Sequence, residues 1–335
     1  MEASRRFLPG DVAVEEKRLD ISLIIPCYNE EAHIRPCLES LLDDFARARC
    51  EILVVDGMSS DGTVPIVAEL QKKHRNIRIL RNPDRLQSHG LNLGIRAARG
   101  DKIVRIDAHS VYPKHYVKRC IELLEGSDAD NVGGMMLPVG RTAFERAVAM
   151  AMRHPAGVAN SKFHKGNFNG YADTVYLGTF KKTLFEKLGY FDPLAHPTED
   201  AEMNLRIRKS GGKIYLDSSL AVRYVPRSSF RELARQYYAY GQGQAYIARK
   251  HGRLTAARQL VPPIFALAVL GSFAITPLYY ASLTIPLVSL LLFTAAGFTA
   301  QVGQDARVRG YLPLVFLTMH FFRGLGFVVG LIQRN

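Results

Sequence analysis

The sequence predicts an α/β protein with a doubly wound sheet, followed by a C-terminal membrane region. From Ile21 to about Pro138, short β-branched runs alternate with longer helical stretches, which is the pattern of strands and helices in such a sheet. Residues 259–304 contain no Asp, Glu, Lys or Arg, and a helix that spans a bilayer needs about 20 apolar residues. These two observations place a water-exposed α/β domain before a membrane-embedded segment.

The expected elements follow from the positions of the β-branched runs and the helical stretches between them. A polar tail at residues 1–20 precedes a domain that covers residues 21–227. Within it, the segment 141–227 mixes loops with one clear helix at 199–209, which a Gly-Gly pair ends. Strands are expected at 21–26, 52–55, 77–80, 103–106 and 131–136, and helices at 30–45, 63–74, 88–98 and 114–124.

The composition favours anionic partners and a cytosolic domain. The 335 residues include 44 Lys and Arg against 31 Asp and Glu, a formal charge of +13, which attracts nucleotides, phospholipid headgroups or nucleic acid. The four cysteines show no CxxC pair and no metal-ligand spacing, so we expect reduced, structural thiols. Residues 1–20 lack the apolar core of a secretory signal, which leaves the N-terminal domain in the cytosol.

The C-terminal region, residues 259–335, is expected to cross the membrane about three times. Its first apolar stretch breaks near Tyr280 and so offers two spans, and a third apolar run lies at residues 312–332. Basic residues precede the first span and separate the second from the third, which places both points inside and the C-terminus outside. Because Arg323 interrupts the third run, the alternative is a re-entrant or surface-lying segment.

The segment 228–258 is rich in Arg and Tyr and leads into the first apolar stretch. Between Arg223 and Arg258, Glu232 is the one acidic residue among eight basic ones. A basic helix of this kind is expected to lie on an anionic bilayer surface. An ordinary solvated helix is the alternative.

Polar residues follow the first two predicted strands, at the edge of the sheet where ligands gather. The first strand ends in PCYNE, which includes Pro26, Tyr28 and Glu30, and the second ends in DGMSSDGT, which begins with Asp56. A carboxylate at a strand end can accept the N–H of a planar base, and a Gly-rich turn lets the backbone approach a ligand. The Asp-Gly pair is also an ordinary turn former.

The fourth predicted strand ends in RIDAH, residues 105–109. Since side chains alternate along a strand, Asp107 and His109 are expected to point to the same side. A carboxylate and an imidazole can jointly hold a divalent cation. A lone D-x-H is more often structural.

The helix at 199–209 begins with a pair of carboxylates. Pro197 and Thr198 mark its start, so Glu199 and Asp200 lie in the first turn, where the helix dipole favours the ionised form. Adjacent residues diverge by about 100° around a helix, so only one of the two is expected to address a reacting centre. An acidic first turn is also ordinary helix stabilisation.

Taken in order, the stretches IIPCYNE, VVDGMSSDGT, RIDAH and GYFDPLAHPTED resemble the inverting glycosyltransferases of family 2, which have the GT-A fold. The resemblance covers residues 21–227. It implies that Asp200 is the catalytic base and that a divalent metal, Mn²⁺ or Mg²⁺, binds at Asp107 and His109. It implies a nucleotide-sugar site, with Asp56 at a uracil-type base, made by Pro26, Tyr28, Glu30, Asp56 and Asp107.

Two departures from the family pattern refine the resemblance. His109 replaces the last acid of the DxD motif, so metal ligation there uses a different group. The chain has no Trp and therefore lacks the QxxRW motif of processive synthases, which predicts that one sugar is added per binding event. The D-A-H variant, the YGQG stretch and the C-terminal spans resemble succinoglycan-type exopolysaccharide glucosyltransferases, which extend a lipid-linked oligosaccharide.

This resemblance implies UDP-glucose as the donor, a lipid-linked oligosaccharide as the acceptor, an anionic membrane as a further partner, and no nucleic acid. Glu199, Arg235 and Arg323 are expected on the acceptor side, and Arg323 is expected to face the other spans or the phosphates of a lipid carrier. A polyprenyl phosphate or a diacylglycerol is an alternative acceptor.

Other classes of protein are less compatible with the sequence. A dehydrogenase needs a G-x-G-x-x-G after the first strand and a P-loop nucleotidase needs a GxxxxGK motif, and the chain has neither. A channel or transport component, tethered to the membrane with a nucleotide-binding scaffold, remains an alternative at this point.

Overall fold

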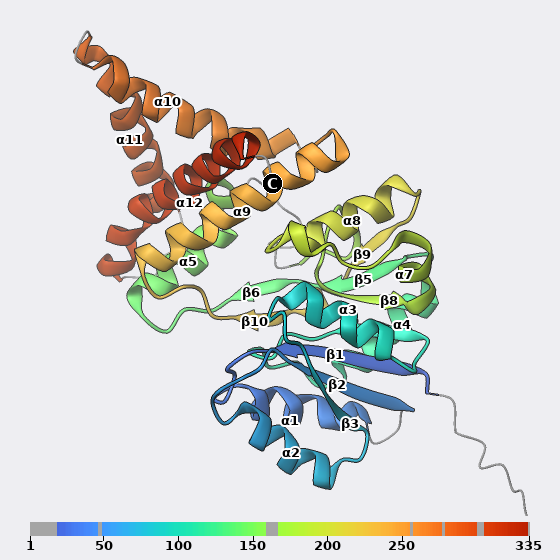
Figure 1. Ribbon diagram of the computed structural model, residues 1–335. Helices are drawn as coiled ribbons and strands as arrows, with labels where there is room; N and C mark the ends of the chain where they lie inside the picture. The colour runs from blue at the N-terminus through green and yellow to red at the C-terminus, as the bar shows by residue number, and fades with distance from the viewer. Residues whose placement is uncertain are drawn as a thin grey trace, which may run out of the picture.

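The computed structural model describes residues 19–45, 49–158, 167–254, 257–276, 279–299 and 305–333. Figure 1 shows a sheet with helices on both faces and a group of helices at one end of it. The predicted α/β architecture is confirmed, and the sheet is mixed. The expected tail at 1–20 lies almost entirely outside the described residues.

The first four strands form the parallel half of the sheet, as the alternating pattern predicts. Their order is β3-β2-β1-β4, and β1 pairs in parallel with both of its neighbours. Every residue of β1 and β2 is buried, which is typical of strands that are covered on both faces. Their bounds are Ile21–Cys27 (β1), Cys50–Asp56 (β2), Ile77–Arg81 (β3) and Lys102–Arg105 (β4).

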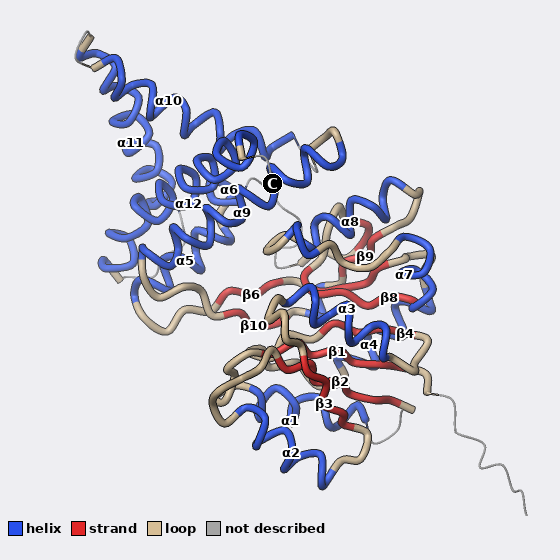
Figure 2. Tube along the Cα trace, viewed as in Figure 1, coloured by secondary structure: helices blue, strands red, loops and turns tan. Residues whose placement is uncertain are grey.

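Helices cover both faces of this half, with the strands as one layer between them (Figure 2). Helices α1, α2 and α4 pack on one face, through residues such as Leu38, Val67 and Cys120, and α3 packs on the other through Leu91 and Ile95. Two helices begin later than predicted because turns precede them. The bounds are Ile34–Phe45 (α1), Thr63–Lys73 (α2), Gln87–Ala97 (α3) and Tyr116–Gly126 (α4).

The second half departs from the predicted doubly wound pattern, because β8 runs antiparallel to both of its neighbours, β4 and β5. The expected strand at 131–136 is divided into β5 and β6, and β6 pairs with β10 in a separate sheet. The segment 141–227, in which one clear helix among loops was expected, contains that helix and also further strands and helices. The bounds are Asn131–Gly134 (β5), Met136–Pro138 (β6), Gly170–Tyr171 (β7), Tyr176–Lys181 (β8), Ile214–Leu216 (β9) and Val222–Tyr224 (β10).

Two further helices pack on the face that α3 covers. They are α7 (Lys182–Leu188) and α8 (Glu199–Lys209), and Phe185 and Met203 anchor them in the core. The bounds of α8 are those predicted from the sequence.

The remaining helices form a second core at one end of the sheet. The apolar side of α9 packs on α12, where Leu233 and Tyr237 join Leu312 and Phe316 in one buried cluster. Helix α5, which the sequence analysis did not predict, completes this cluster and begins with a capping box. The bounds are Ala143–Arg153 (α5), Pro155–Val158 (α6), Phe230–His251 (α9), Val261–Ile275 (α10), Thr284–Thr299 (α11) and Ala306–Ile332 (α12).

Of the expected membrane spans, one coincides with a helix of sufficient length. Among the described residues, only α12, with 27 residues, is both long and apolar enough to cross a bilayer. Helices α10 and α11 have 15 and 16 residues. Each is roughly 22–24 Å long at about 1.5 Å per residue, against a hydrocarbon core of about 30 Å.

Glycine is required where α9 and α12 meet. A Cβ atom at Gly241 would lie 2.1 Å from the carbonyl oxygen of Arg323, and one at Gly326 would lie 2.0 Å from that of Tyr238. Both contacts involve backbone atoms of the facing helix, which cannot rotate away as a side chain could. The two glycines therefore set the distance between the helices.

We expect Gly326→Ala to lower the melting temperature, because overpacking a tight contact costs about 1–3 kcal/mol. Gly310→Ala is the matched control in the same helix, since no atom lies within 4 Å of the Cβ it would add. Thermal unfolding of the detergent-solubilised protein measures both. Equal melting temperatures for the two variants would mean that α9 and α12 can move apart without a loss of folding free energy.

Candidate active site

A buried arginine at the end of β4 lies at the centre of a carboxylate cluster. The Arg105 guanidinium pairs with Asp200. It also lies 3.5 Å from Oδ1 of Asp107 and 3.7 Å from Oε1 of Glu199. The Arg105 side chain is 6% exposed. One cation therefore faces three carboxylates, which leaves an excess of negative charge when all three are ionised.

Two neutral donors orient the Asp107 carboxylate. Gln87 Nε2 donates to its Oδ1 at 3.2 Å, and the Tyr176 hydroxyl donates to its Oδ2 at 3.2 Å. Gln87 begins α3 and Tyr176 begins β8, so three segments that are distant in sequence meet at this carboxylate. The antiparallel strand β8 is thus part of the site.

Asp107 and His109 lie in the turn beyond β4, which ends at Arg105. The expected alternation of strand side chains therefore does not apply to them, although both line the same cavity. Nδ1 of His109 lies 3.2 Å from Oε1 of Glu30, and this contact raises the pKa of His109. An Nδ1–H that donates to Glu30 leaves Nε2 as the ring atom that can bind a cation.

Glu199 and Asp200, although adjacent in the first turn of α8, both reach Arg105. The guanidinium is a planar fork with several N–H groups, so it can meet two carboxylates of one helical turn. The Glu199 side chain is 3% exposed and that of Asp200 is 31% exposed. Asp200 is therefore the more accessible of the two to a molecule in the cavity.

Burial raises the pKa of Asp200 to about 7, and the charges of Glu199 and Asp107 add to this rise against the opposing charge of Arg105. Burial also raises the pKa of Glu199. The expectation that the helix dipole keeps Asp200 ionised is therefore wrong. A helix end contributes about 0.3–1 kcal/mol at an exposed site, whereas each pKa unit corresponds to about 1.4 kcal/mol.

The pH dependence of the reaction follows from this pKa if Asp200 accepts a proton. Only the ionised carboxylate can do so, so kcat/KM is expected to rise with pH, reach half of its plateau near the Asp200 pKa of about 7, and stay high above it. Initial rates at limiting acceptor, in buffers from mildly acidic to mildly alkaline, measure this profile. A flat profile through neutral pH would contradict the assignment.

Three of the expected nucleotide-sugar residues lie at or just after the ends of β1 and β2 and are not among the residues that line the cavity: Pro26, Tyr28 and Asp56. Asp56 is buried, and its two oxygens accept the backbone N–H of Ser59 at 3.3 and 3.2 Å. Tyr28 is exposed, and the Arg85 guanidinium lies 5.6 Å from the centre of its ring. Pro26 is buried at the end of β1. Of the expected nucleotide-sugar residues, Asp107 lines the cavity. Glu30 contacts His109, which also lines the cavity.

A cavity of about 730 Å³ connects the carboxylate cluster with the C-terminal helices. The three residues expected on the acceptor side, Glu199, Arg235 and Arg323, all line it. Arg235 comes from α9 and Arg323 from α12, and Nε of Arg323 donates to Oε1 of Gln244 at 3.1 Å. The cavity thus extends from a carboxylate-rich end to an end lined by arginine and tyrosine side chains.

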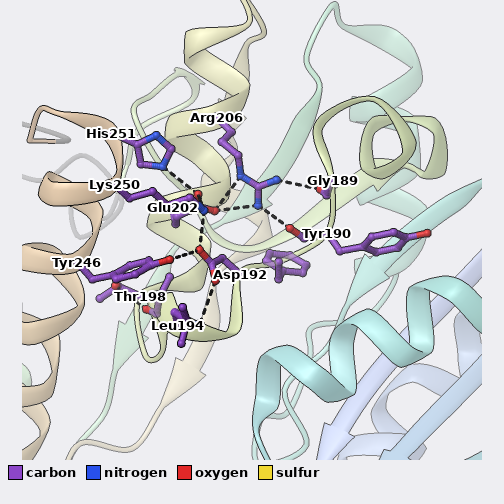
Figure 3. A network of polar contacts seen from close by, with 12 residues as sticks. Gly189, Tyr190, Asp192, Leu194, Thr198, Glu202, Arg206, Tyr246, Lys250 and His251 are labelled. Atoms are coloured by element: carbon purple, nitrogen blue, oxygen red, sulfur yellow. Dashed lines mark hydrogen bonds and ion pairs between the residues drawn. The ribbon is translucent and has the colours of Figure 1, made fainter. Parts of the chain in front are cut away.

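A charge network holds α8 against α9 (Figure 3). Glu202 is fully buried and contacts Lys250 Nζ at 2.8 Å and His251 Nε2 at 2.9 Å. Lys250 also donates to Asp192 at 2.5 Å. Because Asp200 lies in the same turn of α8 as Glu202, this network fixes the helix that carries Asp200 relative to α9.

The sequence predicts no role for Arg105, Gln87 or Tyr176, and Lys250 is predicted only as one of the basic residues of the segment 228–258. Arg105 has a signal in the sequence, since it is the one charged residue in the strand expected at 103–106, and a charged side chain that is buried there needs a partner. Gln87 and Tyr176 have none, because their contacts with Asp107 depend on how α3 and β8 are placed.

The chain matches a known protein family over half of its length, which includes Arg105 and Asp107 of the cluster. Residues 22–189 match Glycosyl transferase family 2. The succinoglycan biosynthesis protein ExoA of Rhizobium meliloti (strain 1021) is 31% identical over 264 residues, which cover 76% of this chain and 80% of that protein. A protein of Methanococcus voltae is 29% identical over 328 residues, which cover 94% of this chain and 98% of that one. Its name is dolichyl N-acetyl-alpha-D-glucosaminyl phosphate 3-beta-D-2,3-diacetamido-2,3-dideoxy-beta-D-glucuronosyltransferase.

Solved structures show the same fold. The mannosyltransferase PcManGT from Pyrobaculum calidifontis, in complex with GDP-Man and Mn²⁺, has a TM-score of 0.61 at 21% identity over 95% of this chain and 88% of that chain. S. aureus TarS 1-349, in complex with UDP-GlcNAc, has a TM-score of 0.51 at 15% identity over 92% of this chain and 91% of that one. The mixed sheet and these neighbours are those of the GT-A fold. With the family match and the identity to ExoA, this chain is a glycosyltransferase that belongs to family 2.

Proposed function

We propose that this chain transfers a single sugar, glucose from UDP-glucose, to a lipid-linked oligosaccharide in exopolysaccharide biosynthesis, with inversion at the anomeric carbon. The observation that supports this most is the cavity, which joins the Asp107–Asp200 cluster to the arginine-lined surface of the C-terminal helices. A donor and an acceptor that enter from opposite ends would meet at Asp200.

The donor occupies the end formed by the sheet. Asp56 and Tyr28 receive the base, where Asp56 can exchange the Ser59 N–H for the N–H of a uracil. Asp107 and Glu30 lie on the side of the diphosphate, together with His109. Pro26 keeps the end of β1 in place beneath them.

In the reaction, Asp200 accepts the proton of an acceptor hydroxyl as its oxygen forms a bond to the anomeric carbon. The bond between that carbon and the diphosphate oxygen breaks at the same time, and the electron pair leaves with the diphosphate. Arg105 holds the Asp200 carboxylate toward the cavity through its ion pair. Glu199 shares this guanidinium and orients the first turn of α8.

The metal-ligating side chains in the cavity fit a cation that is shared with the diphosphate. Among the described residues no three His, Cys, Asp or Glu side chains form a cluster that would hold a metal alone. Asp107 and His109 offer one carboxylate and one imidazole to the same cavity, and phosphate oxygens would complete the coordination. A bound Mn²⁺ or Mg²⁺ would neutralise charge on the leaving diphosphate.

The acceptor occupies the end formed by α9, α10 and α12. Arg235 and Arg323 line this end, and guanidinium groups bind phosphate oxygens in a bidentate manner. The relative from Methanococcus voltae has a lipid phosphate-linked sugar in its name, which supports an acceptor of that class. Membership of the family favours an enzyme over a transport component.

A panel of substrates tests this function. Membranes that contain the chain are incubated with radiolabelled UDP-glucose, GDP-mannose or UDP-GlcNAc, and with a lipid-linked oligosaccharide, a polyprenyl phosphate or a diacylglycerol. We expect label from UDP-glucose in the lipid-linked oligosaccharide, and none with Asp200→Asn membranes. Transfer to polyprenyl phosphate or diacylglycerol alone would overturn the proposed acceptor, and transfer from another sugar alone would overturn the proposed donor.

We expect one sugar to be added per binding event. The chain has no Trp and hence no QxxRW motif, and Arg235 begins the stretch at the corresponding place in α9. Mass spectrometry of a defined acceptor after a long incubation with excess donor measures the number of added residues. A ladder of longer products would contradict non-processive transfer.

A further inference from the structure

Helix α12 packs along its length on α9, which is a polar helix. At its beginning, the Tyr311 ring lies 6.2 Å from that of Phe230, the first residue of α9. In its last third, Gly326 meets the backbone of Tyr238. At its end, Gln333 accepts a hydrogen bond from Gln242 at 3.1 Å. The two helices therefore run side by side in the same direction (Figure 1).

The other side of α9 is tied to the catalytic domain. Lys250 and His251 bind the buried Glu202 of α8, and a Cβ at Gly243 would lie 2.3 Å from Oγ1 of Thr198. A charged side chain in the middle of a bilayer costs at least about 2.5 kcal/mol. Because α9 and the catalytic domain cannot enter hydrocarbon, α12 cannot cross the bilayer in this arrangement.

Helices α10 and α11 have the opposite character. They form a hairpin whose turn is closed by Thr276 and Ser282, with 2.9 Å between their hydroxyl oxygens. Residues 259–304, which contain both helices, have no Asp, Glu, Lys or Arg. Large apolar side chains are exposed on both helices of the hairpin, and each of the following has an exposed fraction between 44% and 68%. They are Ile264, Leu267, Leu270, Phe273, Leu287, Val288, Leu290, Leu291 and Leu292.

The charged residues on either side of the hairpin indicate what surrounds its exposed apolar side chains. The exposed Arg253 precedes α10, and the exposed Arg307 follows α11 at the start of α12. Asp305, the acidic residue between α11 and Arg307, is paired with Arg146 at 2.6 Å. An apolar hairpin with arginines at both of its ends matches hydrocarbon bordered by anionic headgroups. A protein partner would need no basic border of this kind.

We infer that the α10–α11 hairpin is the membrane-inserted part of this chain, and that α12 lies at the membrane surface on the same side as the catalytic cavity. The third apolar run at 312–332 is then the core helix of the C-terminal unit. Its buried residues Leu312, Val315 and Phe316 face α5 and α9. The C-terminus lies on the catalytic side, which replaces the predicted topology of three spans.

Cysteine accessibility tests the topology. The four native cysteines are buried, so single cysteines at Gln333 and at the exposed Arg75 of the catalytic domain report their own positions. A membrane-impermeant maleimide is applied to intact spheroplasts and to inverted membrane vesicles. We expect Gln333→Cys to label like Arg75→Cys, in inverted vesicles only. Labelling of Gln333→Cys in spheroplasts, with Arg75→Cys protected, would overturn the inference.

A second pair of variants tests the hairpin itself. Ile264→Arg combined with Leu291→Arg places charge on the apolar faces, and Leu194→Arg is the control, because Leu194 is 65% exposed on the catalytic domain. We expect the double variant, and not the control, to be lost from the membrane pellet after carbonate extraction. A double variant that stays in the pellet but loses a dimer seen by size-exclusion chromatography would show that a second copy covers the hairpin, and would overturn the inference.

Discussion

Asp200→Asn is expected to reduce kcat by about 10²- to 10⁴-fold, the usual contribution of general-base catalysis. The amide keeps the shape of the side chain but cannot accept the acceptor proton. Donor binding should change little, because the base and diphosphate contacts lie at other residues. Single-turnover transfer and equilibrium binding of UDP-glucose separate the two effects.

Glu199→Gln is the matched control, since Glu199 shares the Arg105 guanidinium but its side chain is only 3% exposed. We expect a smaller loss for this variant, because an amide can still orient the start of α8. A Glu199→Gln variant without activity beside a nearly normal Asp200→Asn would reverse the two roles. If both variants stay active, the reaction occurs elsewhere.

Removal of divalent metal is expected to abolish transfer, and Asp107→Ala should do the same at any metal concentration. The diphosphate develops negative charge as it leaves, and in this cavity Asp107 and His109 are the pair placed to share a cation with it. Because imidazole suits Mn²⁺ better than Mg²⁺, Mn²⁺ should support at least as much activity. Rates in chelator, and after titration with each ion, measure this dependence.

Asp84→Ala controls for general loss of negative charge, since Asp84 is exposed beside His89 and lies outside the cavity lining. It should respond to chelator and metal as the native chain does. Full activity in excess chelator, or an unimpaired Asp107→Ala variant, would rule out the proposed metal site.

The parallel half of the sheet could be predicted because local pattern and tertiary structure agree there. Strands β1 and β2 are continuous apolar runs, and burial on both faces is what such runs favour. Strand β8 could not be predicted in this way. Its sequence, YLGTFK, contains a glycine and a lysine and becomes a strand by pairing with β4 and β5, which are distant in the sequence.

The site shows the same division. Asp107 and Asp200 could be found from the ordered motifs, but their shared contact with Arg105 depends on the packing of α8 over the end of β4. The pKa of Asp200 could not be predicted from the sequence for the same reason. A first-turn position indicates a low pKa, whereas burial among carboxylates raises it to about 7.

In the C-terminal region, composition alone does not determine which apolar segments enter the membrane. Residues 312–332 are apolar enough for a span, yet α9, the polar helix that packs on them and from which we infer that they do not cross, lies earlier in the chain. Glycines at 241 and 326 were compatible with either arrangement, because close helix packing occurs in water and in lipid.

The anomeric configuration of the product reports whether the sugar is transferred in a single displacement. In UDP-glucose the sugar is α-linked, and one in-line displacement assisted by Asp200 must give a β-linked product. Proton NMR of the sugar newly added to a defined lipid-linked acceptor distinguishes the two anomers. We expect the native chain to form a β linkage and Asp200→Asn to form none, whereas an α linkage would rule out a single displacement assisted by Asp200.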